Sequence, residues 1–402
     1  MTTRPPTTDR VRRWRADTPG ADRLVHLNNA GAALVPRPVA EAVSGYLALE
    51  SELGAYEAAD ARADAVVEAH AALGRLLGAG ARNVGLAQNS TVAFAQALAA
   101  FDFRPGEIIL TSRADYASNQ IMYLSLARRL GVEVVRAADA PEGGIDPDSV
   151  RALVARRRPA IVALTWVPTN SGLVQPVEAV GAICRAEEIP YLVDGCQAVG
   201  QLPVDVGRVG CDYLAGTARK FLRGPRGIGF LYVADRALDA GAHPLLVDMH
   251  GADWTDPDAF RLTPDARRFE SWEISYALVM GLGAAVAYAL EVGVETARDR
   301  AFALAAHARE LLAGLPGVRV LDRGPELCAI VTLDPAGRSA AELKLALRAR
   351  SINTSAPERT DAVIDMDHKG AASALRLSPH YYNTAEEVEK AVGAIGEALG
   401  KP

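Results

Sequence analysis

From about residue 80 to residue 235, the hydrophobic positions of the chain alternate between two patterns. Short runs rich in Val, Ile, Leu and Tyr are separated by longer stretches in which apolar residues recur at helical spacing. Such alternation is typical of β-α-β units, in which crossover helices join parallel strands. The short runs predict strands at 108–111, 132–135, 160–166, 191–194, 213–215 and 227–233. The longer stretches predict helices at 118–130, 147–157 and 177–188, so we expect a mainly parallel α/β sheet.

The pattern changes from residue 274 onward. Long Ala-rich helical stretches come first, and one of them, 277–289, is shorter than the roughly 20 residues of a membrane span, so we interpret it as a buried helix. Short strands are then predicted at 318–321, 329–333 and 375–377, before a terminal helix that begins at Thr384. These elements favour a smaller α+β domain.

The expected division is an N-terminal arm over 1–25, a large domain over 26–270 and a small C-terminal domain over 271–402. No internal repeat or low-complexity linker separates the two domains, so we expect their boundary to lie within compact structure. The first 15 residues mix Pro, Thr and Arg without a continuous apolar stretch. This is unlike a signal peptide or a membrane anchor, and it predicts a loose arm.

Composition narrows the class of protein. A chain of 402 residues that is 50% hydrophobic and 23% charged can bury a large core, as soluble proteins of more than one domain do. Its net charge of −6 provides no basic surface for a phosphate backbone, so we expect no nucleic acid partner and, without an apolar span, no membrane partner. The four cysteines lack metal-ligand spacing, which predicts no metal, reduced thiols and a cytoplasmic location. They are Cys184, Cys196, Cys211 and Cys328.

The most distinctive residues follow two of the predicted strands. The strand at 191–194 ends at Asp194, and Gln197 comes three residues later. Open α/β sheets bind ligands at the carboxyl ends of their strands, so this carboxylate is placed where it can pair with a protonated ring nitrogen. Lys220 lies in a polar, Gly-flanked turn after the next strand. A lysine that forms an imine and a carboxylate that keeps the ring nitrogen protonated are the groups that pyridoxal phosphate requires as an electron sink.

Together these residues resemble those of fold type I pyridoxal-phosphate enzymes of the class V aminotransferase family. The similarity extends from about His26 to the C-terminal helix. It implies a seven-stranded, mainly parallel sheet in the large domain. It also implies that Lys220 is the catalytic Schiff-base lysine, that Asp194 pairs with the pyridine nitrogen and that Gln197 contacts the ring hydroxyl. Taken singly, an Asp that ends a strand can be a turn former, and a lysine can be a solvated surface residue.

A phosphate site is expected at the start of the helical stretch 92–98. Ser90 and Thr91 precede this stretch, where hydroxyls and free backbone N–H groups converge at a helix N-terminus. An ordinary N-cap explains the same residues without a ligand. Members of the family usually carry Ser/Thr-x-His-Lys, whereas this chain has Thr217-Ala-Arg219-Lys220. Arg219 keeps a phosphate donor and adds a permanent charge, and with Thr217 it completes the expected phosphate contacts.

The resemblance implies two further cofactor contacts. Tyr116 follows the strand at 108–111, where the family places an aromatic residue over the cofactor ring. A Tyr packed at a strand–helix junction is the structural alternative. Asn170 lies in the segment Pro-Thr-Asn-Ser-Gly that ends at Gly172, and this segment resembles a family loop whose Asn lies near the cofactor or the substrate.

Substrate contacts are implied at both ends of the chain. Arg376 opens the segment Arg-Leu-Ser-Pro-His-Tyr-Tyr-Asn-Thr, and the family uses such an Arg to bind the substrate α-carboxylate, a bidentate task that suits a guanidinium. A structural salt bridge is the alternative. Asn29 and Ala30 fit the N-terminal loop that approaches the substrate. The segment 267–273 resembles one that often reaches a neighbouring subunit's active site, so a homodimer is expected.

The resemblance leaves the reaction on the amino acid substrate open. After Lys220 removes the α-proton, loss of a β-sulfur group defines a lyase, whereas reprotonation defines an aminotransferase or an epimerase. Cysteine desulfurases need a mobile nucleophilic Cys ahead of the carboxylate-binding Arg, and the segment 352–376 contains none. The segments around Lys220 and after Arg376 look most similar to ergothioneine-type C–S lyases. We therefore expect a β-eliminating C–S lyase on a cysteine-derived substrate, with an aminotransferase or epimerase, or a non-catalytic scaffold, as the alternatives.

Overall fold

The computed structural model describes residues 8–335 and 337–400. Its centre is a seven-stranded sheet with the strand order β2-β8-β7-β6-β5-β3-β4. β8 is antiparallel to both of its neighbours, and the remaining neighbours are parallel, so the predicted mainly parallel seven-stranded sheet is confirmed. The strands are β2 (Val84–Ala87), β3 (Ile108–Thr111), β4 (Glu133–Arg136), β5 (Ile161–Thr165), β6 (Tyr191–Asp194), β7 (Tyr213–Thr217) and β8 (Gly229–Val233).

Helices cover both faces of this sheet, because successive side chains of a strand point to opposite sides. Ile109 packs in one core and Leu110 in the other. One face is covered by α5 (Ser90–Leu98) and α6 (Ala117–Leu130), which bury Phe94 and Tyr123. Helices on the other face are α4 (Ala63–Leu77), α7 (Pro147–Arg156), α8 (Val177–Ala186) and α11 (Tyr276–Val292).

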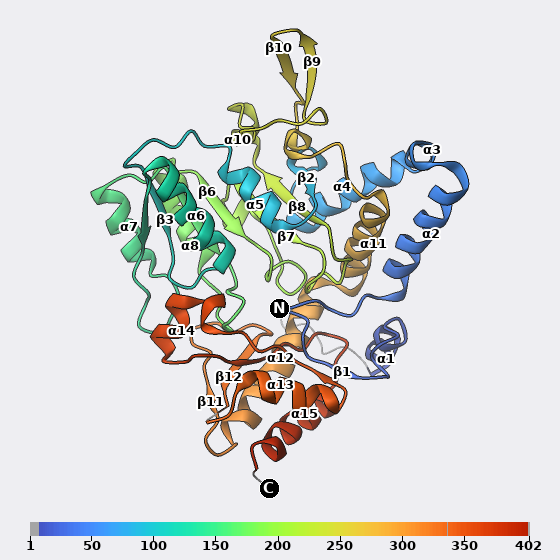
Figure 1. Cartoon of the computed structure of the whole chain (residues 1–402), viewed down its shortest axis with the longest axis vertical. Helices are drawn as coiled ribbons and strands as arrows, with labels where there is room; N and C mark the ends of the chain where they lie inside the picture. The colour runs from blue at the N-terminus through green and yellow to red at the C-terminus, as the bar shows by residue number, and fades with distance from the viewer. Residues whose placement is uncertain (1–7, 336, 401–402) are drawn as a thin grey trace.

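Several elements of the large region were not predicted. The Ala-rich α2 (Arg37–Leu53) and α3 (Ala55–Ala61) lead into α4, and α11 packs against α2 and α4. A hairpin of β9 (Ala252–Asp256) and β10 (Ala259–Leu262) projects from the top of the molecule in Figure 1. Short connecting elements are α9 (Val206–Val209), α10 (Asp235–Asp239) and the 3-10 turns Ala81–Asn83, Ala266–Phe269 and Arg359–Asp361.

The N-terminal segment departs from the expected loose arm. Residues 8–16 form helix α1 (Thr8–Ala16), and its Trp14 is buried against Tyr381 with ring centroids 5.1 Å apart. Arg15 binds Glu387 of the last helix at 2.8 Å. These long-range contacts order a polar segment that has little apolar periodicity of its own. The part of the predicted arm over 1–7 lies outside the described residues.

The C-terminal elements gather below the sheet in Figure 1. A three-stranded sheet has the order β11-β12-β14, and β1 pairs in parallel with β13, so the start of the chain joins this region. α12 packs on α15, whereas α11 packs on α2 and α4, and the division into domains near residue 270 stays a prediction. The elements are β1 (Val25–His26), α12 (Val294–Ala313), β11 (Arg319–Val320), β12 (Val331–Asp334), α13 (Ala340–Ala349), β13 (Ile352–Asn353), α14 (Val363–Lys369), β14 (Leu375–Leu377) and α15 (Ala385–Ala398).

Within residues 8–335 and 337–400, no single helix is long and apolar enough to cross a bilayer. Helices α11 and α12 together have sufficient length and apolar composition, but the chain bends by 78° at their junction. The predicted buried helix at 277–289 lies within α11, whose Val279 and Leu282 belong to the main core. Among the same residues, no group of three or more His, Cys, Asp or Glu side chains is arranged to hold a metal ion.

Candidate functional site

Asp194 lies at the carboxyl end of β6, in the middle of the sheet, and is buried. Its Oδ1 accepts a hydrogen bond from the backbone N–H of Cys196 at 2.9 Å. Its Oδ2 accepts one from the side-chain amide of Asn119 at 2.9 Å. These two hydrogen bonds fix the orientation of the carboxylate. Because each carboxylate oxygen has two lone pairs, the group can still accept a hydrogen bond from a further donor.

Lys220 lies in the turn that follows β7, and its side chain is buried. Burial lowers the pKa of Lys220, and the nearby Arg219 and Arg376 lower it further, against the opposing effects of Cys196 and Asp194. The low pKa favours the neutral amine, which is the form that attacks a carbonyl or accepts a proton. Lys220 Nζ is 5.8 Å from the ring centroid of Tyr116, so these two predicted site residues face each other.

The predicted phosphate corner lies at the start of α5. Ser90 is its first residue and is buried, whereas Thr91 is exposed. The N-cap is Asn89, whose side chain accepts from the N–H of Val92 at 3.0 Å, so the cap falls one residue before the predicted pair. Gly229 of β8 allows the close approach, because a Cβ there would lie 2.7 Å from the backbone nitrogen of Ser90. Gly229 also pairs with the buried Thr217, which brings that hydroxyl residue to the same corner.

Thr169 connects two other predicted site residues, Gln197 and Arg376. The side-chain amide of Gln197 donates to Thr169 Oγ1 at 2.8 Å and to the carbonyl of Ala30 at 2.9 Å. Arg376 Nη1 donates to the carbonyl and the hydroxyl of Thr169 at 2.9 and 3.0 Å. Arg376 Nη2 donates to Asn28 Oδ1 at 3.2 Å. Arg376 is therefore held by neutral groups from two loops.

Asn29 and Ala30 lie close to the Arg376 segment. The N–H of Ala30 donates to Ser378 Oγ at 3.0 Å. Asn29 is fully buried, and its amide donates to the carbonyl of Ser378 at 2.7 Å and accepts from the Tyr382 hydroxyl at 2.6 Å. Its side chain thus holds the loop against the segment after Arg376, and a contact with substrate stays a prediction.

Arg219 and Asn170 complete the predicted set. The guanidinium of Arg219 donates to the carbonyl of Gly31, and burial together with Arg226 lowers the pKa of Arg219. Asn170 is buried, and its backbone carbonyl accepts a hydrogen bond from Lys369 Nζ at 3.3 Å. Arg219 therefore contacts the N-terminal loop, while its predicted phosphate contact stays a prediction.

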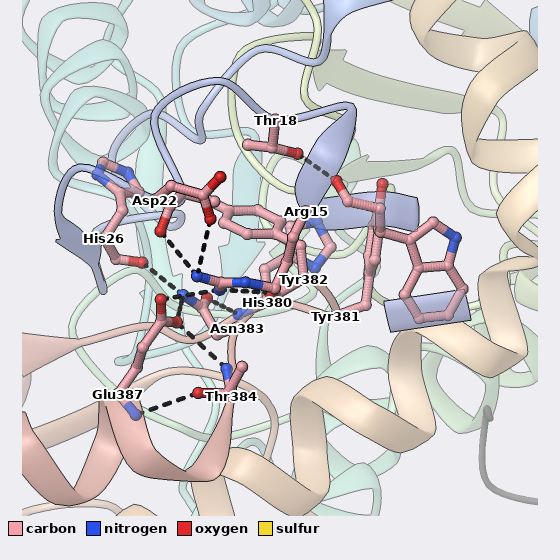
Figure 2. Close-up of polar contacts among 12 residues, drawn as sticks. Arg15, Thr18, Asp22, His26, His380, Tyr381, Tyr382, Asn383, Thr384 and Glu387 are labelled. Carbon is pink, nitrogen blue, oxygen red and sulfur yellow. Dashed lines mark hydrogen bonds and ion pairs between the residues drawn. The ribbon is translucent and has the colours of Figure 1, made fainter. Parts of the chain in front are cut away.

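Figure 2 shows how the segment after Arg376 is braced against the N-terminal helix. Arg15 donates to Glu387 at 2.8 Å and to the carbonyl of Tyr382 at 3.1 Å. His380 is fully buried, and its Nε2 lies 2.8 Å from the carbonyl of Phe221, the residue after Lys220. Burial lowers the pKa of His380 to about 3, so the ring is neutral and Nε2 carries the donating hydrogen. The segment after Arg376 is thus tied to the turn that carries Lys220.

Sequence reasoning assigned no role to three residues of this site, which are Asn28, Asn119 and Thr169. Asn119 is three residues after Tyr116 on α6, and Asn28 and Thr169 each precede a predicted site residue directly. Their spacing to those neighbours was the available signal. The hydrogen bonds of Asn119 to Asp194 and of Asn28 and Thr169 to Arg376 join residues 75 or more positions apart in the chain, so these roles became visible only in the fold.

The donor and acceptor set fits pyridoxal phosphate. Three polar atoms, Gln197 Oε1, Asn170 Nδ2 and Arg376 Nε, are buried without a hydrogen-bond partner among the described residues. Buried polar atoms normally have partners, so this free capacity indicates a polar ligand. Gln197 Oε1 can accept from a ring hydroxyl, Asp194 can accept from a protonated ring nitrogen, and the start of α5 can bind a phosphate.

Comparison with known proteins places this arrangement in one family. Residues 25–391 match the family Aminotransferase class-V. A probable cysteine desulfurase of Xylella fastidiosa is 27% identical over 97% of this chain and 96% of its own. Isopenicillin N epimerase of Streptomyces clavuligerus is 30% identical, covering 94% and 96%. A probable hercynylcysteine sulfoxide lyase of Mycobacterium tuberculosis is 29% identical, covering 96% and 92%.

The fold agrees with this match. The structure of the cysteine desulfurase CsdA from Escherichia coli superposes with a TM-score of 0.88 at 25% identity, covering 97% of this chain and 98% of that one. The chain therefore belongs to the class V aminotransferase family. It is a pyridoxal-phosphate-dependent enzyme, which confirms the predicted family, fold class and cofactor. The alternative of a non-catalytic scaffold protein is therefore rejected.

Proposed function

We propose that this enzyme is a β-eliminating C–S lyase that acts on a cysteine-derived amino acid. The observation that carries the proposal is the absence of a cysteine where a desulfurase needs its nucleophile, beside a buried lysine and a buried arginine that suit proton transfer and carboxylate binding. Lys220 and Arg376 are in place, while the segment 352–376 between β13 and β14 contains no Cys. The relatives named cysteine desulfurase and hercynylcysteine sulfoxide lyase support chemistry at a carbon–sulfur bond.

The cysteines of this chain are poor candidates for the nucleophile of a persulfide mechanism. Burial raises the pKa of Cys184, Cys196 and Cys328 to about 12, and it raises the pKa of Cys211 as well. A thiol with so high a pKa is almost entirely protonated near neutral pH, and the protonated form is a weak nucleophile. We infer that sulfur leaves this site as a free small molecule and is not passed to an enzyme thiol.

Each step of the proposed reaction has a residue of this chain to support it. Bound pyridoxal phosphate supplies the electron sink for the electrons that remain when the α-proton leaves. Arg376 binds the substrate carboxylate, and Asp194 holds the proton at the ring nitrogen. Lys220, whose pKa is lowered by burial, accepts the α-proton at Nζ. The electrons left at Cα form a Cα=Cβ double bond as the Cβ–S bond breaks, and the sulfur group departs with the bonding electron pair. After its release, the aminoacrylate product takes up water to give pyruvate and ammonia.

The proposal is tested by incubating the purified enzyme with cysteine, S-alkyl cysteines and their sulfoxides, and by measuring pyruvate and ammonia. We expect stoichiometric pyruvate and ammonia from at least one compound, and none from the Lys220→Ala variant. Keto acids formed from amino acids without a β-sulfur group, with no pyruvate from any cysteine derivative, would instead establish an aminotransferase.

An epimerase is the second candidate, because the relative with the highest identity among those above carries that name. Inversion at Cα needs a second proton donor on the face of the substrate opposite Lys220. Tyr116 is the candidate for this donor, because its ring faces Lys220. Incubation in deuterium oxide separates the two outcomes. A lyase yields pyruvate, whereas an epimerase returns the intact amino acid with deuterium at Cα and inverted configuration.

We also propose that the enzyme is a cytoplasmic homodimer. The hairpin and the segments before and after it carry exposed large apolar side chains, and a subunit interface would bury such side chains. They are Leu245, Leu246, Met249, Trp254, Phe260 and Trp272. Light scattering on the eluting protein should give twice 42.5 kDa. All four cysteines are free thiols, which supports a reducing compartment.

A further inference from the structure

A second buried carboxyl group, that of Asp115, is connected to Asp194 through the side chain of Asn119. It belongs to the turn between β3 and α6 and is shielded from solvent. Its Oδ1 accepts from the N–H of Tyr116 at 2.7 Å, from Asn119 Nδ2 at 3.2 Å and from the hydroxyl of Thr165. Its Oδ2 accepts from the hydroxyl of Thr111 at 3.0 Å and from the amide of Gln120 at 2.9 Å. The donors are therefore all neutral groups.

Five donors directed at one carboxyl group favour its ionised form, because a protonated carboxyl would turn its own hydrogen toward another donor. Burial raises the pKa of Asp115, and the charge of Asp194 adds to this shift, whereas the hydrogen bonds from Thr165, Gln120 and the Tyr116 N–H oppose it. Gln120 is itself oriented by Arg136, whose Nε and Nη2 donate to Gln120 Oε1 at 3.0 and 2.6 Å. The amide nitrogen of Gln120 is thereby directed at Asp115.

Asn119 links this carboxylate to Asp194. Its single Nδ2 lies 2.9 Å from Asp194 Oδ2 and 3.2 Å from Asp115 Oδ1, so the same amide group donates toward both carboxylates. The opposite orientation of the amide would place its oxygen against two oxygens that act as acceptors, Asp194 Oδ2 and Asp115 Oδ1. The position of Asn119 is therefore determined by two acceptors, and Asn119 in turn limits the orientations open to Asp194.

We propose that Asn119 and Asp115 are positioning residues for the ring nitrogen of the cofactor. Asn119 holds Asp194 in the orientation in which it meets the ring, and Asp115 holds Asn119. Asp115 also fixes the backbone of Tyr116, so one buried carboxylate orients both the residue that covers the ring and the residue that pairs with it. This inference rests on the proposed role of Asp194 in cofactor binding.

The test compares two cofactors that differ only at the ring nitrogen. Apoenzyme is loaded with pyridoxal phosphate or with the analogue in which C–H replaces this nitrogen, and the release of each from the holoenzyme is followed by its visible absorbance. Asp194 can hold only the first through the ring, so wild type should retain it longer. Asn119→Ala should speed release of pyridoxal phosphate by about tenfold to a hundredfold, as expected for one charge-assisted hydrogen bond, and leave release of the analogue unchanged.

Two further variants make the result specific. Asp115→Asn keeps the shape of the side chain and removes its charge, so it should also speed the release of pyridoxal phosphate and not that of the analogue. This variant tests the inference if Asn119→Ala does not fold. Asn83→Ala is the matched control, because Asn83 is another buried Asn that donates to a carboxylate, that of Asp235 at 2.8 Å, and it lies next to the end of β2 opposite to the end that leads into Ser90. It should preserve the wild-type ratio of the two release rates.

The possible failures are distinguishable. If Asn119→Ala and Asp115→Asn speed the release of both cofactors equally, the two residues only support the fold, and the inference is wrong. If both variants keep the wild-type ratio, the inference is also wrong, while the role of Asp194 stands. If wild type itself releases both cofactors at the same rate, then no residue acts through the ring nitrogen, and the proposed role of Asp194 fails together with the inference.

Discussion

Replacing Arg376 with Met should separate substrate binding from cofactor binding. The guanidinium is buried, it donates to neutral oxygens of Thr169 and Asn28, and its Nε has no partner among the described residues. Burial lowers the pKa of Arg376 to about 10, with Asp361 opposing the shift and Arg219 adding to it. A buried cation that has a free N–H and only neutral hydrogen-bond partners is suited to receive an anion.

The size of the effect follows from that environment. Without the guanidinium, the substrate carboxylate would enter a buried site with no charged partner. Losing one partner of such a desolvated pair costs roughly 2–5 kcal/mol, which corresponds to about 30- to 4,000-fold in kcat/KM. The protein itself should lose little stability, because the substitution removes a buried charge that lacks an anionic partner. Arg376→Lys should restore little activity, since an ammonium cannot form the planar bidentate contact.

The assay is a titration of wild type and variant with an amino acid and with the amine that lacks its carboxylate, followed by the visible absorbance of the cofactor. Affinity for the amino acid should fall, while affinity for the amine and the resting spectrum should not change. Arg309→Met is the control, because Arg309 binds the buried Asp322 at 2.8 Å. That variant should lower the melting temperature and keep the preference for the carboxylate. If Arg376→Met weakens both ligands equally and melts early, the residue is only a structural brace.

Three other outcomes are expected. Lys220→Ala should lose the visible band of the lysine-bound cofactor and all turnover while the far-ultraviolet circular dichroism stays native, and a variant that keeps band and turnover would contradict the assignment. Asp194→Ala should weaken cofactor retention and lower kcat by several orders of magnitude; near-normal kcat would mean that another group holds the ring nitrogen. His380 has a folded-state pKa of about 3, below the ordinary value of 6.5, so the unfolded chain binds the extra proton and stability should fall as pH drops from about 6.5 toward 3. The effect at pH 3 is on the order of 4 kcal/mol, and urea unfolding of His380→Gln should show a correspondingly weaker acid dependence if the ring stays neutral in the fold.

The predicted strands of the large sheet lie within a few residues of the observed ones because their apolar runs are long and bounded by turns. β2 was missed, since its four residues include Gly85 and it joins the sheet only through an antiparallel pairing with β8. Helix α1 was missed for a related reason. Its sequence is mostly polar, and it is held by Trp14 on Tyr381 and by Arg15 on Glu387, partners more than 300 residues away. Local pattern carries no information about such contacts.

The candidate site shows the same division between what strand topology dictates and what the fold supplies. In a parallel sheet the carboxyl ends of neighbouring strands meet, so an Asp at the end of one strand and a Lys after the next were predictable as neighbours. The register adds a detail that the sequence could not provide. Thr165 at the end of β5 pairs directly with Asp194 at the end of β6, and its hydroxyl donates to Asp115 and accepts from Asn119, the residue that also binds Asp194. Sequence therefore predicted the residues proposed for the cofactor site, whereas the groups that orient their side chains depend on a register set by the whole sheet.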